Sequence, residues 1–180
     1  TSLRTNVSVL RRYDQLPAEM RGQVLDDVES EAKELTALVN ELVELATDRR
    51  NDEPVEELAL NDAVSSVVDR ARRRSTRTVL LVADDSRVAG QRSALERAVS
   101  NLVENAAKFD QSDAPIEVTV RQGRVQVDDR GPGVPEDDLP HLFERFYRAV
   151  DARSRPGSGL GLAIVQDIVT RHGGQVFAAN

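Results

Sequence analysis

Two asparagines and a lysine on one predicted helix carry the first candidate chemistry. A helix expected over residues 91–108 places Asn101 and Asn105 four residues apart on one face, with Lys108 one turn further along. An amide oxygen is a hard, neutral ligand that Mg²⁺ accepts beside phosphates and water. A lysine adds positive charge for the same phosphates. Because paired asparagines are more often ordinary exposed residues of a helix, this pattern needs support from other segments.

A second candidate is the segment Asp129-Arg130-Gly131-Pro132-Gly133, which directly follows a predicted strand. Glycines in a tight turn let the backbone approach a flat ligand, because no Cβ intervenes. The carboxylate of Asp129 can accept a hydrogen bond from an exocyclic amine such as that of adenine. By itself the segment fits an ordinary turn at the end of a strand equally well.

The third candidate, Gly157-Ser158-Gly159-Leu160-Gly161, opens a predicted helix. Free backbone N–H groups and the positive end of the helix dipole form a phosphate site there. The segment is neither a P-loop nor a dinucleotide fingerprint, because no Gly-Lys-Ser/Thr follows and no strand precedes it. The loop before it, residues 149–156, is predicted to act as a lid.

Between the second and third segments, residues 142–148 read Leu-Phe-Glu-Arg-Phe-Tyr-Arg. We expect Phe143 and Phe146 to fix the base of the lid to the core, a role that ordinary packing would also explain. Arg145 and Arg148 are expected to reach a terminal phosphate.

The elements that must position these residues alternate between helices and strands. Helices are expected over residues 61–74 (Asn61 as N-cap), 91–108, 136–146 and 160–171, and strands over 79–83, 87–89, 116–120, 125–127 and 175–178. Gln122-Gly123 is expected to form a hairpin turn, and Gly173 to end the last helix. The mixture predicts an α+β sandwich with one helical layer on one sheet.

Residues 1–47 predict two helices around a break at Leu16-Pro17. The second helix carries a narrow apolar stripe made of Leu25, Val28, Ala32, Leu35, Val39, Leu42 and Ala46. That stripe either packs on a neighbouring domain or pairs with a second copy in a dimeric four-helix bundle, and its heptad regularity favours the bundle. The polar residues 48–54, which end in proline, predict a linker.

Composition excludes several classes of function. The chain has 180 residues and no cysteine, so disulfides, thiolate metal sites and cysteine nucleophiles are ruled out. A net charge of −7 argues against a nucleic-acid partner. The basic run at residues 72–74 suits the solvated end of a helix. No apolar run approaches the roughly 20 residues that a membrane span requires.

Taken together, the four candidate segments resemble the N, G1, F and G2 boxes of sensor histidine kinases, most of all those of actinobacteria. These kinases share an ATPase superfamily with gyrase, Hsp90 and MutL, whose ATP-binding domain is a two-layer α/β sandwich of the GHKL (Bergerat) type. The resemblance covers residues 54–180, and the preceding hairpin fits the dimerisation domain of the kinases. It implies a helical hairpin over 1–47, a linker over 48–54 and an ATP-binding domain over 55–180.

The resemblance also implies roles for single residues. It assigns the binding of ATP and Mg²⁺ to Asn101, Asn105, Lys108, Asp129, Gly131, Gly133, Arg145, Arg148, Gly157, Gly159, Leu160 and Gly161. Asn105 would bind Mg²⁺, and Asp129 would recognise the adenine amine. The catalytic candidates are Glu104, Lys108 and Arg145.

The acceptor half of the reaction is expected outside the chain. Only His141 and His172 occur, and neither lies in the hairpin, so the phosphorylated histidine is expected upstream of Thr1 and the closing strand of the domain beyond Asn180. His172 is expected to cap the last turn of its helix, and His141 to be a surface or packing residue. The implied partners are a second copy and a response-regulator receiver domain, and the implied location is the cytoplasmic part of a membrane-anchored kinase.

Two alternatives stay open. The first is an ATP hydrolase of the same superfamily, although such enzymes place a glutamate base where this chain has Asn101. Glu104 keeps that alternative open. The second is a regulatory module that binds a nucleotide without transferring phosphate.

Overall fold

A computed structural model describes residues 17–48, 53–75, 77–149 and 157–180. The chain divides into two compact units at Thr47/Asp48, with Gly157 and Ser158 grouped in the first unit, and each unit is described by itself. The helix expected over residues 1–13, the linker residues 49–52 and the lid residues 150–156 lie outside the described residues.

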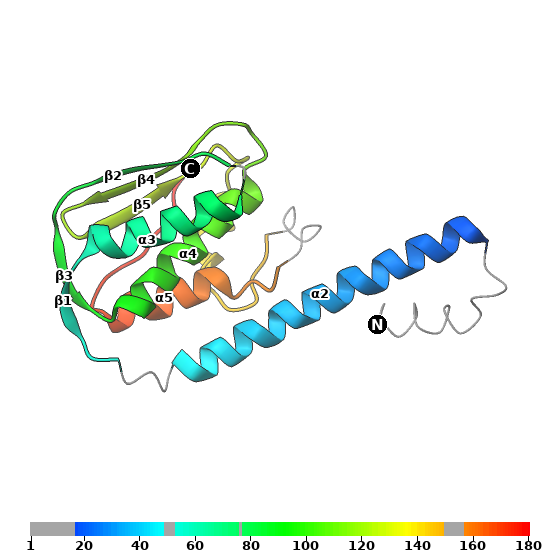
Figure 1. The fold of residues 1–180 in the computed structure, drawn as a ribbon, viewed down its shortest axis with the longest axis horizontal. Coiled ribbons are helices and arrows are strands. Elements are labelled where there is room, and N and C mark those ends of the chain that lie inside the picture. Colours follow the sequence, from blue (N-terminus) through cyan, green and yellow to red (C-terminus); the bar gives the residue numbers. More distant parts are fainter. Residues whose placement is uncertain (1–16, 49–52, 76, 150–156) are drawn as a thin grey trace. The chain divides into compact units, whose positions relative to one another are not determined.

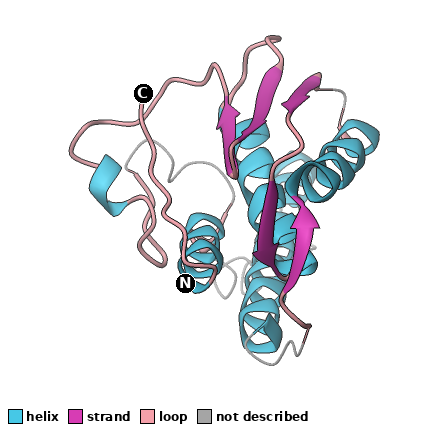
Figure 2. Cartoon of the chain, turned by 90° about the vertical axis from the view of Figure 1, so that its left-hand side faces the viewer, coloured by secondary structure: helices cyan, strands magenta, loops and turns pink. Residues whose placement is uncertain are grey.

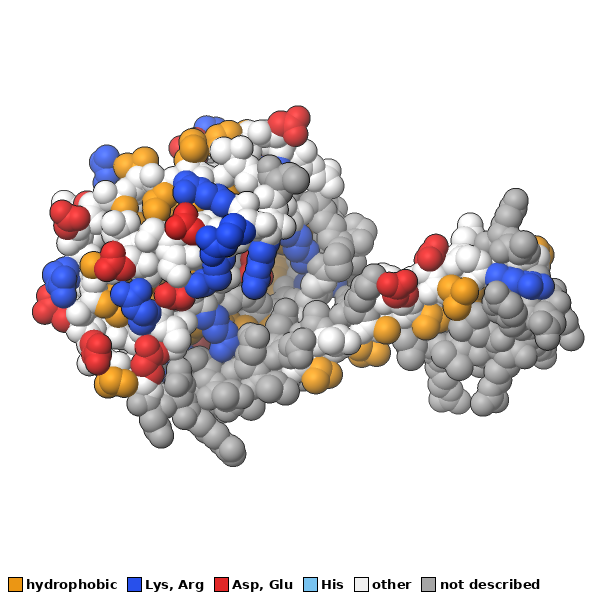
Figure 3. Space-filling model, in the orientation of Figure 1, with side chains coloured by type: hydrophobic (Ala, Val, Ile, Leu, Met, Phe, Trp, Pro, Cys, Tyr) orange, Lys and Arg blue, Asp and Glu red, His pale blue; other side chains and the backbone are white. Residues whose placement is uncertain are grey.

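The first unit is described by one long helix, α2 (Ala18–Asp48), which confirms the second helix of the predicted hairpin. The carbonyl of Pro17 accepts the N–H of Arg21 at 3.1 Å, so the proline lies at the opening turn as expected. Hydrophobic side chains are spaced along the helix surface (Figure 3), and the exposed ones include Met20, Leu25, Leu35 and Val39. No helix in the described ranges is both long and apolar enough to cross a bilayer.

In the described residues of the second unit, the strands form two sheets (Figure 1). Strand β2 (Val79–Ala83) pairs in parallel with β4 (Ile116–Arg121), and β4 pairs antiparallel with β5 (Arg124–Asp128). A separate antiparallel pair joins β1 (Glu56–Ala59) to β3 (Arg87–Gly90). The expectation of one sheet is therefore corrected. The strand β1 was missed because Glu-Glu-Leu-Ala lacks the β-branched and aromatic residues that mark strands.

The hairpin between β4 and β5 has the predicted turn. Gln122 and Gly123 both adopt positive φ, at 51° and 75°, as the favoured two-residue hairpin turn requires. The other predicted strands, 79–83, 87–89, 116–120 and 125–127, also occur within one or two residues of the expected bounds.

Three helices of the described second unit pack together: the first two contact the larger sheet, and the third packs against the second (Figures 1 and 2). They are α3 (Leu60–Arg74), α4 (Arg92–Phe109) and α5 (Gly161–Arg171). Alternate residues of β4 point into the core, where Ile116, Val118 and Val120 are at most 1% exposed. The predicted α+β sandwich is thereby confirmed, with its core between the helices and this sheet.

The expected N-cap of α3 is wrong. The helix begins at Leu60, so Asn61 lies inside it, and Ala59 occupies the cap position without a side-chain hydrogen bond. The backbone supplies the missing partner, because the N–H of Leu60 donates to the carbonyl of Ser86 at 3.0 Å. A neighbouring loop therefore satisfies a group that local capping would otherwise serve.

Two further elements differ from expectation. Instead of a helix over 136–146 there is one 3₁₀ turn, η2 (Leu139–His141), because Pro140 lacks an N–H and the surrounding residues make short-range turns. Residues 174–180, all described, contain no strand, so the strand predicted over 175–178 is wrong. Side chains hold this segment instead: Asn180 binds the backbone of Val134, and the Arg124 guanidinium lies 5.5 Å from the ring centroid of Phe177.

Candidate functional site

Helix α4 carries the candidate amides. Its buried face consists of Ala94, Ala98, Val99, Val103 and Ala106. Asn101, Asn105 and Lys108 lie half-buried beside that face. The Asn101 amide nitrogen donates to the carbonyl of Arg97 at 3.0 Å, and its oxygen faces the first residue of α5: a Cβ built on Gly161 would lie 3.0 Å from it. The first and third candidate segments are therefore in contact.

The second candidate segment lies against the C-terminal end of the same helix. A Cβ built on Gly131 would lie 2.7 Å from the Asp129 carboxylate and 3.4 Å from the carbonyl of Phe109, so a side chain at this position would displace the Asp129 carboxylate from the turn. The exposed Asp129 accepts the N–H of Gly131 at 2.7 Å, which closes the turn. The ammonium of Lys108 lies 4.7 Å from the ring centroid of Phe109. The turn and the cationic end of α4 are neighbours.

The phenylalanine-containing segment joins the glycine-rich one through the backbone. The N–H of Phe146 donates to the carbonyl of Gly159 at 3.0 Å, and a Cβ on Gly159 would lie 2.7 Å from the carbonyl of Tyr147. Gly159 also has a φ of +75°, which favours glycine. Substitution of this glycine would therefore disturb both segments.

The expected role of Phe146 is wrong. This residue is 60% exposed, because its φ of +64° places it in the left-handed region and turns its side chain away from the core. Phe143 is half-buried. The apolar anchor is instead Leu160, which is fully buried and directly precedes α5.

The remaining predicted site residues make fewer contacts with the candidate segments. Arg145 is exposed, and Arg148 is half-buried. Glu104 is exposed and accepts a hydrogen bond from the Ser100 hydroxyl at 2.9 Å. Gly133 adopts a φ of +73° next to Asn180. Gly157 belongs to the first unit, so it is not placed relative to the other candidates.

His172 has the expected structural role. Its Nδ1 lies 2.8 Å from the carbonyl of Ile168 in the last turn of α5, and its Nε2 accepts the N–H of Gln91 at 3.1 Å. Gly173, with a φ of +72°, ends the helix as predicted, and the N–H of Gly174 donates to the carbonyl of Val169 at 2.9 Å. The exposed His141 pairs with Glu144 at 2.7 Å.

Sequence reasoning missed Asp110, whose side chain is 0% exposed. It forms an ion pair with Arg77 at 2.6 Å and accepts the N–H of Arg130 at 3.2 Å. Hydrogen bonds, the largest from the Ser112 side chain, hold the pKa of Asp110 well below its usual value of 3.8. The only available signal was its position directly after the predicted helix, which does not reveal burial.

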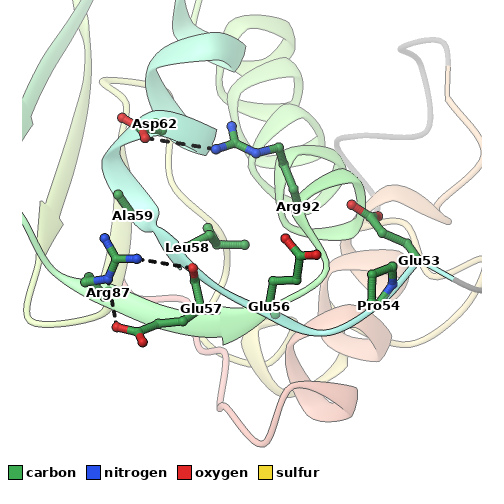
Figure 4. Close-up of a pocket in the computed structure, with 10 residues that line it drawn as sticks. Glu53, Pro54, Glu56, Glu57, Leu58, Ala59, Asp62, Arg87 and Arg92 are labelled. Carbon is green, nitrogen blue, oxygen red and sulfur yellow. Dashed lines mark hydrogen bonds and ion pairs between the residues drawn. The ribbon is translucent and has the colours of Figure 1, made fainter.

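A shallow concavity lies elsewhere, beside β1 and the starts of α3 and α4 (Figure 4). Four carboxylates line it, from Glu53, Glu56, Glu57 and Asp62, against two guanidinium groups, those of Arg87 and Arg92. None of the candidate segments contributes to it. Its excess of negative charge disfavours a triphosphate, so the contacts of α4 indicate the site better than this hollow does.

The candidate residues suit a magnesium-bound nucleotide chemically. A half-buried amide oxygen, a lysine on the same helix face, glycine-lined backbone and a carboxylate at a nearby turn meet in one region of the second unit. Among the described residues, no cluster of three or more histidine, cysteine, aspartate or glutamate side chains could hold a metal ion. An amide oxygen can serve as a Mg²⁺ ligand beside phosphate oxygens.

Comparison with known proteins identifies a family and several similar proteins. Residues 90–180 match the family described as "Histidine kinase-, DNA gyrase B-, and HSP90-like ATPase". The chain is 40% identical over 189 residues to the signal transduction histidine-protein kinase/phosphatase MprB of Mycobacterium leprae. The aligned region covers 97% of this chain and 36% of that relative. The chain thus spans little more than a third of the length of this curated relative.

Two solved structures are similar as well. A mycobacterial sensor histidine kinase MprB is 34% identical with a TM-score of 0.59, over 66% of this chain and 80% of that chain. The ATP-binding domain of PrrB from Mycobacterium tuberculosis is 27% identical with a TM-score of 0.57, over 72% of this chain and 88% of that chain.

Proposed function

Because this chain belongs to the histidine kinase-, DNA gyrase B- and HSP90-like ATPase family, we propose that its second unit is the ATP-binding part of a sensor histidine kinase. In this proposal residues 55–180 bind Mg-ATP, and the γ-phosphate passes to a histidine upstream of Thr1. A response-regulator aspartate then receives it. Helix α2 belongs to a hairpin that pairs with a second copy, a role supported by its exposed apolar residues.

The proposed roles follow the chemistry of each group. Asn105 would hold Mg²⁺, which when bound would supply charge neutralisation for the phosphates. Asn101 and Lys108 lie near the phosphates, and the Asp129 carboxylate accepts a hydrogen bond from the exocyclic amine of adenine. Arg145 and Arg148 approach the γ-phosphate, while Gly159 and Gly161 offer backbone N–H groups to the phosphates.

One observation carries the proposal: α4 contacts two separate glycine-containing segments, through Asn101 with Gly161 and through Phe109 with Gly131. Segments 30 residues apart in sequence thereby flank the same helix. Phosphoryl transfer depends mainly on positioning and charge neutralisation, which such an arrangement supplies.

Labelling with γ-phosphate-labelled ATP tests the proposal, in a version of the protein that includes the residues upstream of Thr1. We expect acid-labile, base-stable label, which is typical of phosphohistidine, and its loss in Asn105→Ala. Absence of label in a folded protein that binds ATP would overturn the kinase assignment. Rapid multiple-turnover hydrolysis that Glu104→Gln abolishes would favour the ATP hydrolase instead.

Calorimetry tests the adenine pocket. Asp129→Asn should weaken ATP binding, because an amide presents a donor as well as an acceptor to the adenine amine. The matched control is Asp128→Asn, one residue earlier, where the carboxylate binds the side chain of Gln126. Equal affinities in Asp129→Asn and the unmodified protein would remove Asp129 from the pocket.

A further inference from the structure

Asp110 is a buried carboxylate whose partners are all hydrogen-bond donors. One oxygen accepts the backbone N–H of Ser112 at 2.7 Å. The other accepts the Arg77 guanidinium at 2.6 Å and the backbone N–H of Arg130 at 3.2 Å. An asparagine in this place would direct its NH₂ group at a donor in either orientation. The site therefore requires a carboxylate rather than any polar group of that size.

Arg77 neutralises the buried charge of the Asp110 carboxylate and links it to the backbone through further hydrogen bonds. The Arg77 side chain is 20% exposed. In addition to its bond with the Asp110 carboxylate, it donates to the backbone carbonyls of Asp110, Ser112 and Ala114. A buried carboxylate with an opposite charge and satisfied lone pairs holds one geometry strictly, because any displacement leaves charge unpaired in a medium of low dielectric constant.

The third partner connects this cluster to nucleotide recognition. Arg130 lies between Asp129 and Gly131 in the turn proposed to hold adenine, and a Cβ on Gly131 would lie 3.5 Å from the Asp110 nitrogen. Asp110 also directly follows α4, two residues beyond Lys108. One side chain thus joins the end of the helix proposed to hold phosphates to the turn proposed to hold the base.

We propose that Asp110 is a positioning residue, which together with Arg77 sets the distance between the adenine-binding turn and the phosphate-binding face of α4. This inference rests on the proposed function, and it assigns Asp110 no contact with the nucleotide. Misplacement of a recognition group by a fraction of an ångström weakens binding, because the hydrogen bond to the base loses its geometry.

The test compares ATP with inosine triphosphate, whose base lacks the exocyclic amine. In the unmodified protein we expect ATP to bind more tightly. In Asp110→Asn we expect ATP affinity to fall on the order of tenfold, with inosine triphosphate affinity nearly unchanged. A purely structural role would weaken both ligands equally. Titration calorimetry well below the thermal midpoint of each variant gives both affinities.

Asp84→Asn is the matched control. Asp84 also caps a turn, accepting the N–H of Ser86 at 3.0 Å and that of Gln122 at 2.8 Å, and its pKa is also lowered. It has no bond to the proposed adenine turn. Its substitution should leave the ratio of the two affinities unchanged, and an equal loss of ratio in both variants would overturn the proposal.

A second variant covers the case in which Asp110→Asn does not fold. Arg77→Lys keeps the positive charge but loses bonds to the carbonyls, and it should lower the ATP preference by a smaller factor. A preserved preference in the folded variant overturns the inference. If the unmodified protein does not prefer ATP over inosine triphosphate, the proposed adenine pocket is wrong. If it does prefer ATP and the variants keep that preference, only the positioning role of Asp110 is wrong.

Discussion

The two ends of helix α4 are both held by side chains that are distant in sequence, but by different physical means. At the C-terminal end the buried Asp110 pairs with Arg77. At the N-terminal end Gln91 makes no side-chain cap hydrogen bond. Instead Glu53 accepts the N–H of Ser93 at 3.2 Å, and His172 accepts the N–H of Gln91.

The difference lies in exposure to water. Glu53 and His172 are half-buried, so water competes for their hydrogen bonds, and each bond contributes less than one that is shielded from water. The Asp110 side chain is 0% exposed, so its hydrogen bonds face less competition from water and its geometry is more strictly held. We infer that α4 is anchored firmly where it meets the proposed adenine turn and more adjustably where it meets the segment that follows the linker.

The largest expected effect comes from breaking the buried pair. Arg77→Met removes the cation beside Asp110 and the bonds to three carbonyls, and it should lower the thermal midpoint by about 10 °C. Circular dichroism on heating measures this. The control is Arg87→Met, whose side chain is 55% exposed and pairs with the exposed Glu57, and it should shift the midpoint by less than about 2 °C. Equal shifts would mean that burial does not separate the two pairs.

The dependence of the free energy of unfolding on pH in acid should reveal the contribution of Asp110. The pKa values of Asp110 and Asp84 are lowered from 3.8 in the folded protein, so both carboxylates stabilise it above the unfolded pKa. That stabilisation is lost as pH falls below about 4. Asp110→Asn should therefore flatten the decline in the free energy of unfolding between about pH 4 and pH 2. Asp84→Asn should flatten the decline less than Asp110→Asn does. Denaturant titrations across this pH range measure both effects, and a larger effect from Asp84→Asn would contradict the prediction.

A smaller effect is expected at the other end of the helix. His172→Ala removes two hydrogen bonds and a half-buried ring, and should cost about 2 kcal/mol of unfolding free energy. The exposed His141→Ala serves as control and should cost less than about 0.5 kcal/mol. Urea denaturation distinguishes the two. A cost for His172 as small as that for His141 would show that α5 does not help to hold the start of α4.

The smallest effect is expected at Glu53. Glu53→Ala removes the carboxylate that caps α4 and should cost about 1 kcal/mol, whereas Glu53→Gln keeps an acceptor oxygen and should cost about half as much. Glu56→Ala, an exposed neighbour on β1, is the control. If Glu56→Ala destabilises as much as Glu53→Ala in the same urea assay, the cap contributes nothing specific.

Features that depend on neighbouring residues were predictable. The hairpin at Gln122-Gly123 follows from the backbone freedom of its two residues, and the helix end at Gly173 follows from its left-handed conformation. The face of α4 follows from its amphipathic spacing. In the same way, the order of candidate segments was sufficient to predict the family.

Features that depend on a distant partner were not predictable. The pairing of β1 with β3 and the supply of a carbonyl from Ser86 to Leu60 require chain segments about 30 residues apart. The short turn η2 is a different case: Pro140 is a local signal that was present in the sequence, and it was given too little weight against the apolar pattern around it.

By itself, the sequence determined the residue types of the candidate site, the main helices and strands, and the apolar periodicity that builds the core. Only the tertiary structure decided which polar groups are withdrawn from water. Asp110 and Asp84 look alike in the sequence, yet one side chain is wholly buried beside Arg77 and the proposed adenine turn. Desolvation and partner geometry arise when distant segments pack, and no local pattern encodes them.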